Sequence, residues 1–226
     1  MNFTPLKSGV SVEGDEILAY RSEEKASKYN YIMAGVHGDE VEGVYLLQEL
    51  FKWLQEEDLT IPLIVIPILN VDGYRSQTRV NAHGVDLNRN LPSSNWTEKA
   101  RDDKYHPGES ALSEPENKYL VKLFEKYPPK FILTLHSWKP MLNYNGSDCE
   151  KYAKVIHEHN NYPLVADIEG HPTPGSLGEY GPENYDAQVL TFEAPLISEE
   201  KSLQNIWEEN EAGLKALLKS QHLNLQ

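Results

Sequence analysis

The sequence contains one cysteine, Cys149, among 226 residues, so no disulfide bond can form within the chain. It also lacks a long hydrophobic run, because its apolar stretches have about the length of a strand and a membrane span needs roughly 20 residues. The first residues, MNFTPLKSGVSVEGDE, show no basic start followed by an apolar segment, as a secretory signal would. These absences argue against a membrane partner and favour a cytoplasmic location.

Positive charge is also scarce, since 21 Lys and Arg residues face 35 Asp and Glu residues and the net charge is -14. Nucleic acid is therefore a poor partner. Only five arginines are present, and four of them (Arg75, Arg79, Arg89 and Arg101) fall within residues 75–101. In so acidic a chain this clustering indicates a local site for an anion, with chance clustering in a polar loop as the alternative.

The apolar pattern predicts strands alternating with helices. Strands are expected at 29–36, 61–69, 131–138 and 187–194. Helices are expected from about Glu40 to Leu54, from a capping box at Ser113 to Glu125, at 147–159 and at 203–218. Residues 70–112 and 167–185 read as long loops, which are usually functional in compact domains. The alternation predicts one α/β domain over residues 1–226, with a mixed, mainly parallel central sheet flanked by helices.

Three polar groups stand at the ends of predicted strands. His37 and Glu40 follow the first strand, His136 ends the third, and Glu193 ends the last. Ligands of open α/β sheets bind at the carboxyl edge, where such groups can meet although they lie far apart in sequence.

This set of residue types suits a catalytic metal. His37 and Glu40, three residues apart at a strand-to-helix junction, can hold one ion together, and His136 can complete a set of three. Three protein ligands with a fourth position open to water are typical of catalytic zinc, although cobalt or nickel would also bind. An HxxE pair alone is a weak signal, and a lone histidine at a strand end is more often a satisfied core residue.

The remaining groups of a peptidase are also present. A carboxylate such as Glu193 at a buried strand end is costly unless it is paired or working, and beside an activated water it could act as general base and then general acid. Asn88 and Arg89 could bind a substrate carboxylate, and Arg79 could stabilise an oxyanion. Each alone is consistent with an ordinary loop residue, so the combination carries the hypothesis.

The segments HGDE, GVDLNRN, LHS, PTPGSLG and TFEAP, in this order over nearly the whole chain, resemble the zinc carboxypeptidase family M14. The resemblance implies one zinc ion, with His37, Glu40 and His136 as its ligands and Glu193 as the catalytic glutamate. It implies that Asn88 and Arg89 hold the terminal carboxylate of the substrate. It also implies that Arg79 is the oxyanion arginine, with Arg75 as the alternative.

Within the family, HGDE and PTPGSLG are most similar to the bacterial murein peptide amidase branch, which cuts γ-D-glutamyl–diaminopimelate bonds. This implies a cytoplasmic role in peptidoglycan recycling. Pancreatic members carry a mobile tyrosine shortly before the Gly-Ser pair, where this chain has His171. Either His171 or Tyr180 would then donate a hydrogen bond to the scissile amide, or no residue takes this role. Leu177 falls where the family sets side-chain preference, although an apolar residue there does not explain recognition of zwitterionic diaminopimelate.

The sequence thus favours a zinc metallocarboxypeptidase acting on a small peptide with a free carboxylate. Two other enzymes stay open: a deacylase of N-acyl amino acids of the aspartoacylase and succinylglutamate desuccinylase type, and a general carboxypeptidase for ordinary peptides. A protein that captures peptide carboxylates without cutting them is the non-enzymatic alternative.

Overall fold

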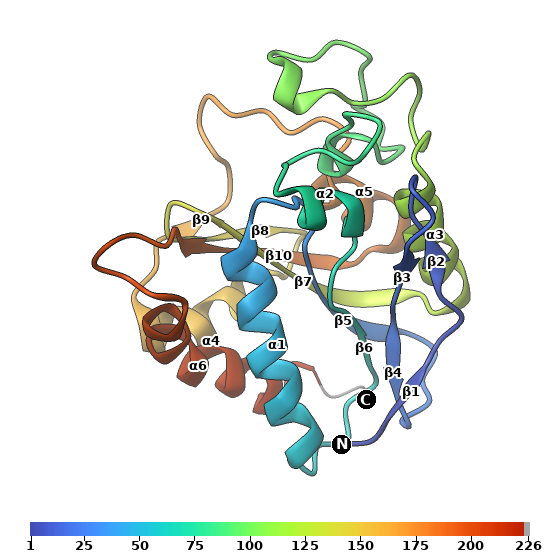
Figure 1. Ribbon diagram of the computed structural model, residues 1–226. Coiled ribbons are helices and arrows are strands. Elements are labelled where there is room, and N and C mark those ends of the chain that lie inside the picture. Colours follow the sequence, from blue (N-terminus) through green and yellow to red (C-terminus); the bar gives the residue numbers. More distant parts are fainter. Residues whose placement is uncertain (224–226) are drawn as a thin grey trace.

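The computed structural model describes residues 1–223, and a mixed sheet of eight strands runs through its centre (Figure 1). The strand order is β1 (Phe3–Pro5), β4 (Tyr20–Ser22), β6 (Leu63–Ile66), β5 (Tyr29–Ala34), β7 (Pro129–Trp138), β10 (Gln188–Pro195), β8 (Met141–Asn145) and β9 (Leu164–Val165). The central strands β6, β5, β7 and β10 are parallel, whereas β8 and β4 run antiparallel to their central neighbours. The predicted fold class is confirmed.

Helices cover both faces of this sheet (Figure 1). One face packs against α1 (Val41–Glu56), α4 (Glu150–Asn160) and α6 (Leu203–Lys219), and the other against α3 (Pro115–Lys126) and α5 (Leu177–Tyr185). Because successive strand residues point to opposite faces, Leu133 and Leu135 of β7 join the first core and Ile132 joins the second. The smaller elements are β2 (Gly9–Val10), β3 (Glu16–Ile17), α2 (Val71–Ser76) and two 3₁₀ turns at Leu87–Arg89 and Asp103–Tyr105.

Three sequence-based expectations are wrong in detail. Residues 71–76, expected in a loop, form α2, because the Asn70 side chain caps the helix by accepting a hydrogen bond from the Gly73 backbone N–H. Residues 177–185 form α5 rather than part of a loop, because the Ser176 side chain caps the helix by accepting a hydrogen bond from the Glu179 backbone N–H. The expected capping box at Ser113 does not form either. The N-cap of α3 is Glu114, whose side chain makes no capping bond, and Ser113 Oγ instead donates to Glu114 Oε1 at 2.6 Å.

The first turn of α1 lies against the end of β7. A Cβ atom on Gly43 would stand 2.4 Å from the carbonyl oxygen of Leu135, and one on Gly38 would stand 2.0 Å from the backbone of Gly73. Neither approach tolerates a side chain, so glycine at both positions lets the segment 37–43 settle between β7 and α2. This contact fixes where Glu40 points.

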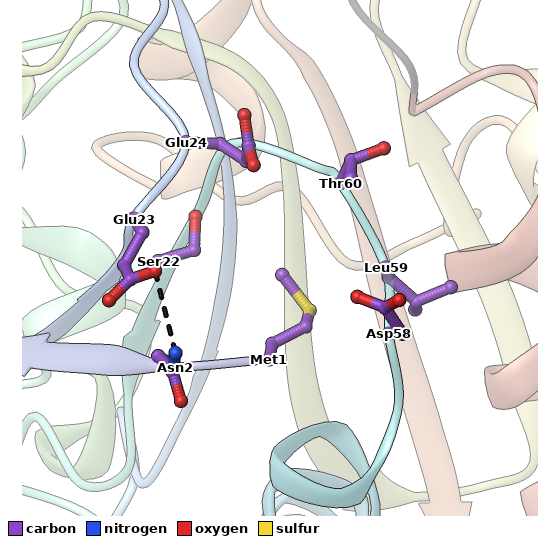
Figure 2. A pocket seen from close by; sticks show the side chains of 8 residues that line it. All are labelled: Met1, Asn2, Ser22, Glu23, Glu24, Asp58, Leu59 and Thr60. Atoms are coloured by element: carbon purple, nitrogen blue, oxygen red, sulfur yellow. Dashed lines mark hydrogen bonds between the residues drawn. The ribbon is translucent and has the colours of Figure 1, made fainter.

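None of the helices within residues 1–223 is long and apolar enough to cross a membrane. At the amino edge of the parallel strands, a shallow hollow lies beside the start of β6 (Figure 2). It is lined by Met1, Asn2, Ser22, Glu23, Glu24, Asp58, Leu59 and Thr60, and it contains none of the predicted site residues. The chemistry expected from the sequence therefore belongs to the opposite, carboxyl edge.

Candidate active site

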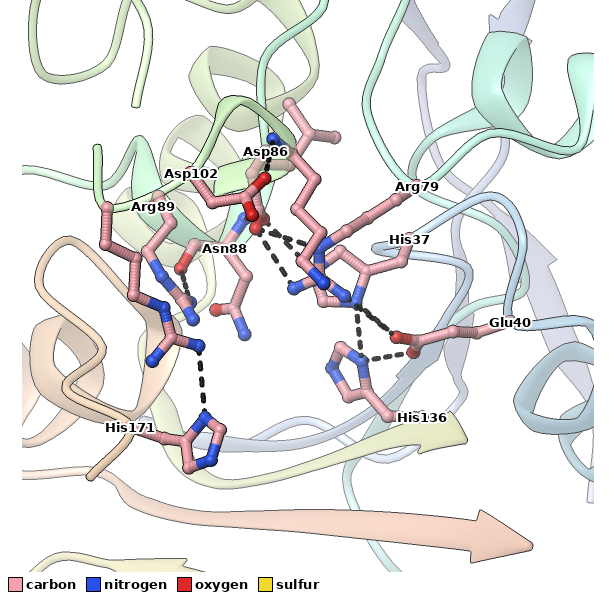
Figure 3. A network of polar contacts seen from close by, with 12 residues as sticks. His37, Glu40, Arg79, Asp86, Asn88, Arg89, Asp102, His136 and His171 are labelled. Atoms are coloured by element: carbon pink, nitrogen blue, oxygen red, sulfur yellow. Dashed lines mark hydrogen bonds and ion pairs between the residues drawn. The ribbon is translucent and has the colours of Figure 1, made fainter. Parts of the chain in front are cut away.

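The three polar groups predicted at strand ends meet at the carboxyl edge of β5, β7 and β10. These strands are neighbours and run parallel, and Glu193 of β10 stands directly beside His136 of β7 in the strand register. His37 and Glu40 come from the connection between β5 and α1 and face His136 (Figure 3). Residues separated by more than 150 positions in sequence thus line one cavity of about 340 Å³.

His37, Glu40 and His136 form a compact cluster of nitrogen and oxygen donors. Nδ1 of His37 lies 2.7 Å from Glu40 Oε1, Nδ1 of His136 lies 2.7 Å from Glu40 Oε2, and the two nitrogens are 3.2 Å apart. Ligands of a tetrahedral zinc ion with bonds of about 2.0–2.1 Å stand about 3.3 Å apart. The 3.2 Å between the two histidine nitrogens fits this spacing, whereas the two 2.7 Å contacts of Glu40 are hydrogen-bond distances. Each residue offers one donor atom, and the three atoms lie within 4.8 Å of one another, so they could hold one metal ion.

Asp86 supports this cluster from behind, and the sequence reasoning assigned it no role. Its Oδ1 lies 3.0 Å from His37 Nε2, and its Oδ2 accepts two hydrogen bonds from Arg79 at 3.0 and 3.1 Å. Burial raises the pKa of Asp86, but His37 and Arg79 outweigh it and hold the pKa well below its usual range. A carboxylate on the far nitrogen of a metal-binding histidine fixes the orientation of the ring.

Glu193 differs from these acids because its Oε2 is enclosed and receives no hydrogen bond from any residue within 1–223. Burial raises its pKa to about 8. An enclosed carboxyl group whose oxygen has no fixed hydrogen-bond partner can accept a proton from a water in the cavity and return it, which suits a general acid–base catalyst. The side chain lines the same cavity as the His–Glu–His cluster.

The structure separates the two candidate oxyanion arginines. Arg79 lines the cavity, and its Nη1 donates to Glu40 Oε1 at 3.3 Å. Arg75 lies on α2 at the surface and forms ion pairs with Glu13 and Asp15. Of the two, only Arg79 lies where it could stabilise a negative charge that develops beside the cluster of His37, Glu40 and His136, called the metal-site cluster below.

Asn88 and Arg89 lie together further along the cavity (Figure 3). Asn88 is held in place because its Oδ1 accepts a hydrogen bond from the Leu177 backbone N–H at 2.9 Å. Arg89 is buried, and burial lowers its pKa. No carboxylate within residues 1–223 forms an ion pair with it, and its Nη1 donates only to the Asn88 carbonyl at 2.6 Å. A buried guanidinium of this kind suits an incoming carboxylate.

The three expected specificity residues fare differently. His171 lines the cavity, with its ring 5.3 Å from that of Trp138. The side chains of Leu177 and Tyr180 are buried in the core between the sheet and the helices α3 and α5, so neither lines the cavity. The tyrosine that does line it is Tyr105, which the sequence reasoning missed because nothing distinguishes it from other loop tyrosines.

Comparisons with known proteins agree with this geometry. Residues 3–195 match the model of the Peptidase M14 family, described as zinc carboxypeptidase. The chain belongs to the zinc carboxypeptidase family. It is therefore a peptide hydrolase of a zinc-dependent family.

Similar proteins support the same assignment. Murein peptide amidase A of Vibrio campbellii is 32% identical over 212 residues, which cover 89% of this chain and 83% of that protein. The crystal structure of murein-tripeptide amidase MpaA from Escherichia coli O157 has a TM-score of 0.77 at 25% identity, covering 94% of this chain and 90% of the other. Carboxypeptidase A from Helicoverpa armigera, at 20% identity and a TM-score of 0.77, covers 97% and 69% and shares the fold.

Proposed function

We propose that this zinc carboxypeptidase hydrolyses the γ-D-glutamyl–diaminopimelate bond of murein peptides and releases the C-terminal residue. The names of its relatives support the murein peptide as substrate. The observation that carries the reaction type is the buried Arg89, which has no carboxylate partner within residues 1–223 and lies in the same cavity as the metal-site cluster and Glu193. A terminal carboxylate bound there would position the last amide bond of a peptide for cleavage.

We assign His37, Glu40 and His136 to the metal, Glu193 and Arg79 to catalysis, and Asn88 and Arg89 to the substrate carboxylate. Zinc bound by the cluster supplies a Lewis acid and makes water acidic enough to react near neutral pH. The protein supplies the rest: Asp86 orients His37, and Arg79 is positioned to stabilise negative charge on the carbonyl oxygen.

Glu193 moves the proton in this scheme. Its carboxylate accepts a proton from the attacking water as the oxygen adds to the carbonyl carbon. The same carboxyl group then gives that proton to the amide nitrogen as the carbon–nitrogen bond breaks. The second proton of that water leaves the new carboxyl group and passes through Glu193 to the released amine. The products are an ammonium group on the departing residue and a carboxylate on the shortened peptide, so atoms and charges balance.

The test is to incubate the zinc-loaded enzyme with L-Ala-γ-D-Glu-diaminopimelate and follow the products by mass spectrometry. Free diaminopimelate should appear with metal and not after chelation. Glu193→Gln should retain zinc and lose most of the turnover, because an amide cannot shuttle the proton, whereas His37→Ala should lose both zinc and activity. Full activity of Glu193→Gln would contradict the mechanism, and an intact tripeptide would move the search to ordinary peptides and N-acyl amino acids.

We also assign His171, which lines the cavity, as a hydrogen-bond donor to the scissile amide. If it has this role, His171→Ala should lower kcat. The cytoplasmic location and the role in peptidoglycan recycling also stay predictions from the sequence.

A further inference from the structure

We propose that the substrate carries a second carboxylate and that Arg101 and Lys104, beside Tyr105, hold it. This inference rests on the proposed function, because it adds a second anion site to the pocket whose first anion site is Asn88 and Arg89. It concerns two residues for which neither the sequence motifs nor the catalytic scheme has a use.

Four cationic side chains surround one aromatic ring in this pocket. The Cζ atoms of Arg79, Arg89 and Arg101 lie 5.1, 5.4 and 4.4 Å from the centre of the Tyr105 ring, and Lys104 Nζ lies 5.1 Å from it. All five residues line the catalytic cavity. Cations over an aromatic face are attracted to it, so the ring gathers charges that would otherwise repel one another.

Of these four side chains, only Arg79 forms ion pairs with carboxylates within residues 1–223. Arg79 forms ion pairs with Asp86 and Glu40. Within residues 1–223, no carboxylate forms an ion pair with Arg89, Arg101 or Lys104. Arg101 instead contacts the loop on the other side of the cavity, donating to the Gly170 carbonyl at 3.3 Å and lying 3.1 Å from His171 Nδ1. Arg101 is exposed, and these contacts hold its guanidinium at the edge of the cavity, where a substrate can reach it.

The charge of the pocket calls for more than one anion. Its lining has four cations against the three carboxylates of Asp39, Glu40 and Glu193, and the buried Asp86 behind it is paired with Arg79. A divalent ion held by the cluster would add two positive charges, so the site would carry two more positive charges than negative ones, in a protein whose net charge is -14. One terminal carboxylate on Arg89 leaves one positive charge unbalanced, and a second on Arg101 and Lys104 brings the pocket close to neutrality.

The chemistry of a peptide offers two sources for this carboxylate. It can stand on the residue whose carbonyl is attacked, as the α-carboxylate of a γ-linked glutamate does. It can also stand on the side chain of the departing residue, as the second carboxylate of diaminopimelate does. Both would meet a planar guanidinium and an ammonium group, so matched substrates must separate them.

The experiment compares kcat/KM of the zinc-loaded enzyme for three peptides. The first is L-Ala-γ-D-Glu-diaminopimelate. In the second, an amide replaces the α-carboxylate of glutamate, and in the third, lysine replaces diaminopimelate and so removes the side-chain carboxylate. The wild-type enzyme should prefer the first peptide to one of the other two by about ten- to a hundredfold, as expected for hydrogen bonds to a charged group. The peptide that is disfavoured identifies the source.

Two variants then test the residues. In Arg101→Gln and Lys104→Gln this preference should fall towards one, while zinc content stays that of the wild type. The matched controls are Arg75→Gln and Lys154→Gln, which remove a cation paired with surface acids far from the cavity lining. They should retain the full preference.

The outcomes separate this inference from the proposed function. If the wild-type enzyme cleaves none of the peptides, the proposed function fails. If it cleaves all three at equal kcat/KM, the proposed reaction stands and the second carboxylate site is refuted. A preference that persists in both Arg101→Gln and Lys104→Gln would also refute the assignment of these two residues.

Discussion

Replacing Asp86 tests whether its carboxylate orients His37 in the cluster of His37, Glu40 and His136. The replacement Asp86→Asn keeps the shape of the side chain but removes its charge and turns one acceptor oxygen into an NH₂ donor. Asp86 accepts hydrogen bonds from Arg79 and from the Asn88 backbone N–H, and it lies 3.0 Å from His37 Nε2. An amide has only one acceptor oxygen, so its NH₂ group would face an N–H group of either Arg79 or His37, and no hydrogen bond would form there.

The size of the effect follows from the contacts that are lost. Two hydrogen bonds from Arg79 reach one oxygen of Asp86, and hydrogen bonds to charged groups contribute about 1.5–3 kcal/mol each. The Asp86 side chain is fully buried but that of Arg79 is 22% exposed and also contacts Glu40, so water and Glu40 offset part of the loss. We expect a loss of about 3 kcal/mol of unfolding free energy, at the low end for a broken buried pair. Zinc affinity should fall about 10–100-fold, because His37 loses the partner that orients it.

Two measurements check this expectation: urea unfolding followed by circular dichroism, and zinc affinity by competition with a chelator. Asp72→Asn is the matched control. Asp72 is equally buried and accepts hydrogen bonds from Ser11 Oγ at 2.7 Å and the Glu13 backbone N–H at 3.0 Å, but it does not contact the metal-site cluster. It should lower stability without changing zinc affinity. Wild-type zinc affinity in Asp86→Asn would refute the view that Asp86 orients His37.

Two further predictions concern the scaffold. Gly43→Ala would place a Cβ atom 2.4 Å from the Leu135 carbonyl oxygen, so α1 must shift. The free energy of unfolding in urea should fall by about 1–3 kcal/mol, and kcat/KM should also fall. An unchanged urea midpoint would contradict the close packing. Cys149 is fully buried, and burial raises its pKa to about 12, so a thiol reagent at pH 8 should label it only after unfolding. Rapid labelling of the folded enzyme would mean that the α4 core opens in solution.

The sequence was sufficient to predict that His37, His136 and Glu193 meet at one edge of the sheet. His37, His136 and Glu193 end strands that pattern and length identify, and parallel strands place their carboxyl ends at one edge. The partners of these residues could not be predicted in the same way. Asp86 lies in an aperiodic segment, and only the folded chain shows that its carboxylate reaches His37 and Arg79.

Fold details were lost where local signals were weak or misleading. The strands of two or three residues, β1 to β4 and β9, are too short to produce a periodic pattern. Residues 177–185 contain Gly178, Gly181 and Pro182, which favour a loop, but the Ser176 cap and the packing of Leu177 and Tyr180 against the sheet hold them in a helix. Leu177 was therefore expected in the cavity although its side chain belongs to the core.

The register of β10 links the stability of the fold to its chemistry. Phe192 faces the core under α1, α4 and α6, and Glu193, one residue later, faces the cavity on the opposite side of the sheet. A slip of one residue against β7 would exchange them, placing the carboxylate in an apolar core and the phenyl ring beside the metal-site cluster. In the apolar core the carboxylate would lose the electrostatic attraction of His136 and Arg79 that it has in the cavity. Burying a charge without such partners costs several kcal/mol, which is a large share of the roughly 5–15 kcal/mol that stabilises a domain. The same alternation that holds the sheet together therefore also keeps Glu193 beside His136.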